Sequence, residues 1–364
     1  MRIDLSLEDF LALPDTEKVP YIGDRGILYA QQFTRADLDR YNQLADAARS
    51  LARRPEGASY LASLLRHRMA LNFFVQPSSR TFMSFNAAEA MLGLNRMSVR
   101  DPAISSMSKG ESLVDSIRTF ISYVDLIVMR HADDDAAATA FWTATRAHRR
   151  ITLPDGSQVP VPIVSGGSGT TQHPTQALLD VYTLERSLRP VGGLDGKTLL
   201  LVGDLARGRT TRSLAFLMPE FRDVRLIFAA PEQYRMGQDV RDFLDARGVL
   251  WSEVDSLDAG IREADAIYLT RIQDEHDADR SHGSHVRAED RFRFTLDHLD
   301  RMRPHAALLH PLPKRDEVDP AVDDVQDRRV AYWRQERNGM WMRVALLARL
   351  FRVDQALLDV AATR

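Results

Sequence analysis

The chain has 364 residues, of which 44% are hydrophobic and 27% are charged; this composition is typical of a soluble globular protein, and the length favours two domains. Lys and Arg number 48 against 51 Asp and Glu, so the net charge of −3 argues against a nucleic acid or an anionic membrane as partner. The sequence has no cysteine, which excludes disulfides, thiolate catalysis and thiolate-bound zinc.

The N-terminal stretch MRIDLSLEDFLALPD carries acidic side chains and lacks the unbroken apolar core of a signal peptide. No apolar run approaches the ~18 residues that span a bilayer. We therefore expect a cytoplasmic protein. The segment before about Ile27 contains no motif that indicates a role.

Short apolar runs then alternate with helical patterns. In the first half, strands are predicted at 71–75, 126–129 and 161–164, and helices at 80–92, 111–124 and 174–188. In the first of these helices Phe85, Ala88 and Leu92 fall on one face, and Gly93 follows as a predicted C-cap.

A cluster of turn residues between 190 and 196 separates a second series, with strands predicted at 198–202, 224–229, 266–270 and 307–309. Such alternation implies right-handed βαβ units. We predict an α/β fold of two domains, each a mostly parallel sheet flanked by helices. The domains are placed at 1–172 plus 336–364 and at 173–335, because the amphipathic stretch MWMRVALLARLF is expected to pack back on the first domain.

Open α/β sheets bind ligands at the carboxyl ends of their strands. The strand at 71–75 is followed by Ser78, Ser79, Arg80 and Thr81 at the start of a helix. Unbonded N–H groups and the helix dipole favour an anion there, although N-capping by either serine is an alternative. Arg130 follows the next strand, with a surface salt bridge as its alternative.

The strand at 161–164 leads into SGGSGTTQHPTQ, whose glycines let the backbone approach a ligand. His173 and Gln176 stand near a helix start, where they can hydrogen-bond a carbonyl; a capping histidine is the alternative. No Gly-Lys-Ser/Thr follows, so this run is not a Walker loop.

In the second half, the strand ends carry Arg209, then Arg271 with Gln273, then the turn His310-Pro311-Leu312-Pro313. A pair of arginines suits a dicarboxylate. The glycine fingerprint of a dinucleotide-binding dehydrogenase is missing. The two halves therefore predict one phosphate site and one carboxylate site, and a direct transfer between two bound anions.

At this point the motifs match a known family. HPTQALLDVYTL (173–184) resembles the signature of aspartate carbamoyltransferase catalytic chains, and PSSRT (77–81) resembles the carbamoyl-phosphate motif of all carbamoyltransferases. The blocks at 108–131, 203–215, 268–275 and 308–319 follow in family order, so the resemblance runs from about Ile27 to Leu350. The ornithine branch carries a Cys in a His-Cys-Leu-Pro motif, which this chain lacks.

The resemblance implies the site residues. Carbamoyl phosphate would be bound by Ser78, Ser79, Arg80, Thr81, Ser105, Arg130, His173, Gln176, Leu312 and Pro313. Aspartate would be bound by Lys109, Arg209, Arg271 and Gln273. The catalytic roles would belong to Arg80, Thr81, Lys109, Arg130 and His173.

In the family, the loop that carries Ser105 and Lys109 reaches into the neighbouring subunit's site, so a homotrimer with shared sites is implied. The implied reaction joins carbamoyl phosphate to L-aspartate in de novo pyrimidine biosynthesis, without a metal or an organic cofactor. A regulatory or dihydroorotase partner stays open. So do two alternatives: a different amine acceptor, and an inactive scaffold homologue, which the presence of every matched residue disfavours.

Some features depart from the family pattern. Phe82 stands where a basic residue is common, and Ser79 replaces threonine. The segment 132–160 is longer than usual; we interpret it as a solvated surface excursion with a hairpin-like Leu-Pro-Asp-Gly turn, and leave a role in assembly open. His276, His282 and His285 fall in the substrate loop region, and we do not interpret them as a metal site.

Overall fold

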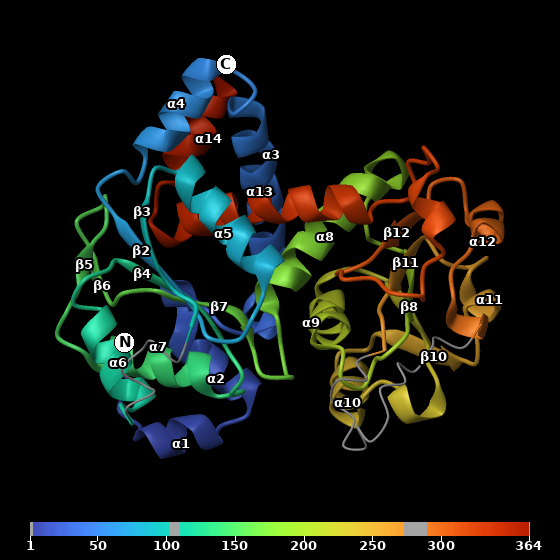
Figure 1. The fold of residues 1–364 in the computed structure, drawn as a ribbon, viewed down its shortest axis with the longest axis horizontal. Helices are drawn as coiled ribbons and strands as arrows, with labels where there is room; N and C mark the ends of the chain where they lie inside the picture. The colour runs from blue at the N-terminus through green and yellow to red at the C-terminus, as the bar shows by residue number, and fades with distance from the viewer. Residues whose placement is uncertain (1–2, 102–109, 273–289, 364) are drawn as a thin grey trace. The chain divides into compact units, whose positions relative to one another are not determined.

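The computed structural model describes residues 3–101, 110–272 and 290–363, which form two compact units (Figure 1). Unit 1 is made of Met1–Thr175 and Gly339–Arg364, and unit 2 of Gln176–Asn338. The chain passes between the units inside two helices, α8 (Pro174–Leu188) and α13 (Tyr332–Leu350). The sequence-based boundaries lie a few residues before these crossings.

Unit 1 is built on a five-stranded sheet in which every pairing is parallel. The strand order is β1-β7-β4-β2-β3. The strands are β1 (Gly26–Ile27), β2 (Met69–Phe74), β3 (Asn95–Val99), β4 (Leu126–His131) and β7 (Ile163–Ser168). The helices of this unit include α1 (Leu7–Ala12), α2 (Asp15–Ile22), α3 (Arg35–Leu51), α4 (Pro55–Ser63), α5 (Ser79–Met91), α6 (Leu113–Phe120), α7 (Ala136–Arg146) and α14 (Asp354–Ala362).

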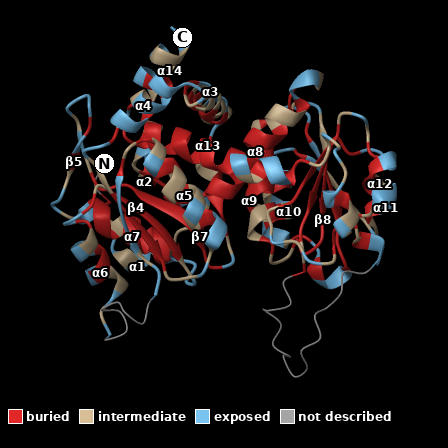
Figure 2. Cartoon of the chain, turned by 45° about the horizontal axis from the view of Figure 1, so that its top comes forward, coloured by how far each residue is buried: buried red, intermediate tan, exposed pale blue. Residues whose placement is uncertain are grey.

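The three central strands of unit 1 are buried on both faces, as Figure 2 shows in red. Their near-continuous apolar sequences suit this position, because helices cover both faces of a parallel sheet. Strand β7 continues beyond the apolar run into Ser165, Gly166 and Ser168, all of them buried. The glycine-rich run is therefore strand at its start, rather than loop throughout.

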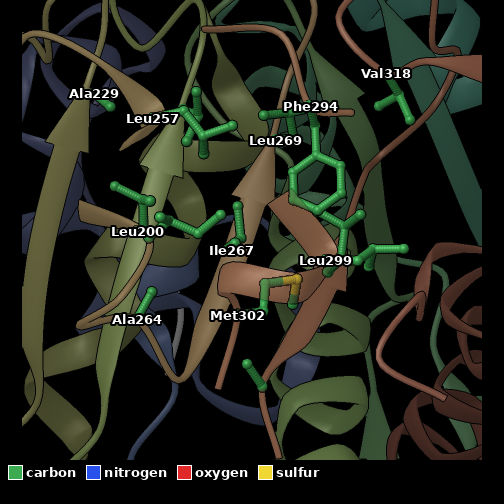
Figure 3. Packing of buried hydrophobic residues seen from close by; sticks show 14 of the residues in the cluster. Leu200, Ala229, Leu257, Ala264, Ile267, Leu269, Phe294, Leu299, Met302 and Val318 are labelled. Carbon is green, nitrogen blue, oxygen red and sulfur yellow. The ribbon is translucent and has the colours of Figure 1, made fainter. Parts of the chain in front are cut away.

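Unit 2 repeats the architecture with a second parallel sheet, ordered β10-β9-β8-β11-β12. The strands are β8 (Thr198–Val202), β9 (Arg225–Ala229), β10 (Leu250–Val254), β11 (Ala266–Leu269) and β12 (Ala307–Leu309). The helices include α9 (Arg209–Leu217), α10 (Gln238–Ala246), α11 (Leu257–Gly260) and α12 (Leu296–Arg301). Figure 3 shows the apolar layer where Leu200 and Ile267 of the sheet pack with Leu257, Phe294 and Met302. The predicted α/β fold with two parallel sheets is confirmed.

The segment 132–160 differs from the expected solvated excursion. Helix α7 occupies much of it, is buried along most of its length, and packs against β4, β7 and α6. Its sequence AAATAFWTATR explains this, because small alanine and threonine side chains allow a helix to lie close to a sheet. The hairpin of β5 (Ile151–Thr152) and β6 (Gln158–Val159) is confirmed, and Gly156 makes its turn at a φ of 80°.

The C-terminal helix packs on the first unit as expected. From Gly339 to Ala348 every residue of α13 is buried, including Arg343, so this part is covered on all sides rather than on one face. Helix α14 then packs against α3. Among the described residues, we find no helix that combines the length and the apolarity needed to cross a membrane.

Candidate functional site

Three strand ends meet at one edge of the unit 1 sheet. The order β7-β4-β2 makes them neighbours, and the N–H of Gln76 donates to the carbonyl of Arg130 across 3.2 Å. Gly166 on β7 completes the contact: a Cβ there would lie 3.3 Å from the carbonyl oxygen of Met129 and 3.4 Å from Cγ2 of Thr81. The predicted residues Thr81 and Arg130 are thus close to the glycine-rich strand.

His173 is held between two hydroxyl groups in the interior of unit 1. Its Nε2 lies 3.4 Å from Oγ1 of Thr81, and its Nδ1 lies 3.5 Å from Oγ1 of Thr175. The side chains of His173 and Thr81 are only 4% and 6% exposed. A neutral imidazole has one donor and one acceptor nitrogen, and a hydroxyl can serve as either partner. The ring is therefore oriented for a specific hydrogen bond.

Arg130 places a guanidinium beside this pair of residues. It is 8% exposed, and its Nη1 donates to the carbonyl of Gly166 at 3.0 Å. Burying a permanent positive charge is unfavourable unless an anion or several acceptors compensate it. A buried arginine at strand ends therefore favours an anionic ligand, and the burial of Arg130 argues against a surface salt bridge.

The start of α5 presents the remaining predicted phosphate ligands. Ser78 is the N-cap residue in extended backbone conformation, but its side chain makes no capping hydrogen bond. The capping alternative is therefore wrong for Ser78. Ser79 and Arg80, the first two helical residues, are exposed. The first-turn N–H groups of α5 and these side chains are together suited to phosphate oxygens.

In unit 2, two of the predicted aspartate ligands, Arg209 and Arg271, flank a close backbone contact. A Cβ on Gly203, just after β8, would lie 2.1 Å from the carbonyl oxygen of Thr270, just after β11. Arg209 begins α9 a short distance beyond the first of these strand ends, and Arg271 directly follows the second. Both arginines are half-buried. The close contact is possible only because Gly203 has no side chain.

The neighbouring Arg207 has a different environment. Its Nε donates to Oδ2 of the buried Asp204 at 2.8 Å, and its guanidinium lies 4.7 Å from the ring centre of Tyr234. These contacts hold the loop after β8. Arg207 therefore stabilises the loop that leads to Arg209.

Gln176 is oriented by a buried carboxylate that sequence reasoning missed. Asp180 accepts hydrogen bonds from Nε2 of Gln176 at 3.0 Å, from Nε2 of Gln335 at 2.6 Å and from the hydroxyl of Tyr268 at 2.7 Å. Burial raises the pKa of Asp180 to about 7, against the opposing effect of these donors. The available signal was an acid within the apolar helix sequence HPTQALLDVYTL.

The same network reaches the turn after β12. Oε1 of Gln335 accepts from the backbone N–H of His310 at 2.9 Å. The His310 ring bridges Glu317 (2.8 Å) and the backbone N–H of Leu312 (2.8 Å). The Leu312–Pro313 bond is cis. Two expected carbamoyl-binding features of unit 2, Gln176 and this turn, are therefore connected through Asp180 and Gln335.

Some predicted residues lie outside the described part of the chain. They are Ser105 and Lys109, Gln273, and the three histidines His276, His282 and His285. Within residues 3–101, 110–272 and 290–363, no group of three or more His, Asp or Glu side chains is arranged to hold a metal ion.

Comparisons with known proteins agree with this arrangement. Residues 25–186 match the family "Aspartate/ornithine carbamoyltransferase, carbamoyl-P binding domain", and residues 195–350 match its "Asp/Orn binding domain". Aspartate carbamoyltransferase 1, chloroplastic, from Pisum sativum is 38% identical over 88% of this chain and 77% of its own. The aspartate carbamoyltransferase catalytic subunit of Thermoplasma acidophilum is 36% identical over 86% and 95%.

Solved structures extend the likeness to three dimensions. Aspartate transcarbamoylase from Trypanosoma cruzi, in complex with carbamoyl phosphate and aspartate, is 34% identical, with a TM-score of 0.76 over 90% of this chain and 97% of that one. The catalytic subunit of the M. jannaschii enzyme is 31% identical, with a TM-score of 0.72 over 91% and 99%. The sequence motifs, the paired α/β units and these relatives together place the chain in the aspartate/ornithine carbamoyltransferase family, among the aspartate carbamoyltransferase catalytic chains.

Proposed function

We propose that this protein transfers the carbamoyl group of carbamoyl phosphate to the amine of L-aspartate, giving N-carbamoyl-L-aspartate and phosphate. The observation that carries the proposal is the buried group Thr81, Arg130 and His173 at the strand ends of unit 1. Donors of this kind suit a carbonyl oxygen that becomes negative during acyl transfer. The arginines at the strand ends of unit 2 suit the carboxylates of aspartate.

The reaction needs no covalent enzyme intermediate. The unprotonated amine attacks the carbonyl carbon, a C–N bond forms, and the C–O bond to phosphate breaks as the amine's proton passes to the departing phosphate. Thr81, Arg130 and His173 stabilise the oxyanion, while Arg80 and Lys109 balance the phosphate charge. Loss of one oxyanion donor is expected to raise the barrier by ~2.7–4 kcal/mol, and alignment of both substrates lowers its entropic part.

The test is product formation from carbamoyl phosphate with L-aspartate, run in parallel with L-ornithine and other amino acids. Turnover restricted to aspartate is the expected result. Turnover with a different amine alone would replace the proposed acceptor. A folded protein without turnover on any acceptor would favour the inactive scaffold alternative.

We also propose that three chains assemble into a trimer with shared active sites, as the naming of relatives as catalytic subunits supports. Sedimentation equilibrium is expected to give three times the chain mass of 41.2 kDa. If sites are shared, mixing the inactive variants Arg80→Ala and Lys109→Ala under exchange conditions restores activity, because some sites then receive both intact residues. If neither the mixture nor a co-expressed hybrid regained activity, the proposal of shared sites would be refuted.

A further inference from the structure

The N-terminal segment before residue 25 lies outside the family match but is part of the unit 1 core. Ile3, Phe10 and Ile22 are fully buried. Helix α1 packs against α7, where Nε1 of Trp142 donates to the carbonyl of Leu5 at 3.1 Å. The segment is therefore a fixed element of this unit, and its inner polar side chains have defined partners.

One of those side chains reaches the residue next to His173. Oδ2 of Asp15, the first residue of α2, accepts from Nε2 of Gln172 at 3.0 Å. The other end of the same amide, Oε1 of Gln172, accepts from the backbone N–H of Ala30 at 2.8 Å. Gln172 is 4% exposed; its bond to Ala30 is buried, and its bond to Asp15 is partly buried. Its side chain is thus held at both ends.

The carboxylate of Asp15 is itself held by charge. Nζ of the buried Lys18 lies 3.5 Å from Oδ1 of Asp15 and 5.8 Å from the ring centre of Tyr29. Asp135, at the start of α7, adds a repulsive charge nearby. The Asp15 side chain is 33% exposed, but both of its partners, Lys18 and Gln172, are buried. The carboxyl group of Asp15 is therefore held on its inner side.

The backbone leading to His173 is held at several points, and the N–H of Gly169 donates to the carbonyl of His131 at 3.0 Å. After β7 the chain turns through residues 169–171, and a single bridge between Ser168 and Gln172 closes the turn. On its other side, Oδ1 of Asp134 accepts from the N–H of Thr170 at 2.7 Å. Because Gln172 directly precedes His173, the two hydrogen bonds of the Gln172 side chain bear on where the imidazole lies against Thr81.

We propose that Asp15 is a positioning residue for His173, acting through the side chain of Gln172. The inference rests on the proposed carbamoyl transfer, in which His173 contacts the reacting carbonyl group. It gives the N-terminal segment a function in catalysis, because small displacements of a catalytic group reduce the rate while leaving substrate binding largely intact.

The experiment uses the full chain with Asp15→Ala, which removes the acceptor, and Gln172→Met, which removes both bonds but keeps the length of the side chain. Rates are expressed per site titrated with N-(phosphonacetyl)-L-aspartic acid, the compound bound in a T. cruzi relative. Each variant is expected to lower kcat about tenfold, within the range seen for displaced groups. The double variant should lose no more than either single one, because both remove the same link.

Two matched variants act as controls. Asp15→Asn retains an oxygen acceptor for Gln172 but loses the ion pair with Lys18, so it should recover most of the kcat that Asp15→Ala loses. Glu17→Gln changes a charge on the exposed face of the same helix turn and should have no effect. A segment that only stabilises the fold would lower the melting temperature and the number of titrated sites, with kcat per site unchanged. That result, or losses that multiply in the double variant, would overturn the proposal.

A readout independent of turnover separates this inference from the proposed function. In protein labelled with ¹³C at the histidine ring, the His173 signal is assigned by its loss in His173→Gln. Asp15→Ala and Gln172→Met should both shift this signal and its titration midpoint, whereas Glu17→Gln should not. Unshifted signals in both variants would refute the positioning role even if the wild-type protein proves inactive. If Asp15→Ala does not fold, Gln172→Met decides alone.

Discussion

At the scale of single residues, His173 lies between the hydroxyls of Thr81 and Thr175. We expect His173→Ala to lower kcat about 10²–10³-fold, the usual effect of losing one oxyanion donor. The affinity for carbamoyl phosphate, measured by calorimetry, should change much less. Poorer binding with an unchanged kcat would contradict the assigned role.

Replacement of Arg271 tests how the protein binds aspartate, its second proposed substrate. A lysine there keeps the charge but loses the planar pair of donors that matches a carboxylate. Arg271→Lys is therefore expected to raise the KM for aspartate at least about tenfold, the equivalent of ~1.4 kcal/mol. Arg222→Lys, at a largely exposed arginine of the same unit that pairs with Asp195, serves as the control and should leave aspartate saturation unchanged.

The buried residue Glu89 makes the stability of the protein depend on pH. Its Oε2 accepts from Asn72 at 2.7 Å, and burial raises its pKa to about 7. In the unfolded chain a glutamate ionises near pH 4.3. Between these values the native state holds a proton that the unfolded state has lost, so the free energy of unfolding falls as the pH rises from about 4 to 7.

Replacing Glu89 with glutamine should remove this dependence, because the amide oxygen still accepts from Asn72 and cannot ionise. In urea unfolding followed by tryptophan fluorescence, the loss of stability between pH 5 and pH 8 should shrink by roughly 2–3 kcal/mol. The exposed Glu56→Gln, at the start of α4, is the control. An equal pH dependence in Glu89→Gln and wild type would show that Glu89 titrates normally.

At the scale of elements, strands made of buried apolar runs could be predicted, and two less buried strands could not. β8 and β12 were predicted at their observed bounds, because TLLLV is apolar after its first residue and ALL is apolar throughout. β3 (NRMSV) and β10 (LWSEV) escaped prediction, since each lies at a sheet edge; β3 is largely exposed and β10 is mostly half-buried. A strand with one partner and a solvated face carries little hydrophobic signal.

The candidate site shows the same division. Cationic and hydroxyl residues that follow buried strands, such as Thr81 and Arg130, could be identified from local sequence. Asp180 and Asp15 could not, because their roles depend on partners distant in sequence, for example Tyr268 for Asp180 and Gln172 for Asp15. Those pairings are consequences of tertiary packing, which no local pattern encodes.

Gly203 lets the chain after β8 come close to the chain after β11, and a substitution at this position tests that contact. Its φ is 113°, and an added Cβ would meet the carbonyl of Thr270 at 2.1 Å. Gly203→Ala should destabilise unit 2 by about 2–4 kcal/mol through strain and overpacking and raise the KM for aspartate. Gly248→Ala has a φ of 67° and open space around the new methyl, so it should lose only about 1–2 kcal/mol. Equal losses would exclude the close contact as the cause.

At the scale of the whole molecule, unit 1 is discontinuous because residues 339–364 complete it. A chain ending at Asn338 would lack the buried part of α13. The apolar surface of unit 1 that packs against α13 would then be exposed, which should prevent unit 1 from folding. Limited proteolysis should then leave a protected fragment from unit 2 alone. A chain ending at Val353, which lacks only α14, should keep both units protected. Protection of unit 1 in the shorter chain would contradict this dependence.

The return of the chain through α13 also sets an order of events during synthesis. A ribosome releases residues 1–175 first, yet those residues cannot bury their apolar surface against α13 until the last part of the described chain emerges. Unit 2 is continuous, so it can finish folding earlier although it is made later. Unit 1 therefore stays incompletely folded while residues 176–338 are translated. The speed of that translation determines how long its apolar surface is available to chaperones.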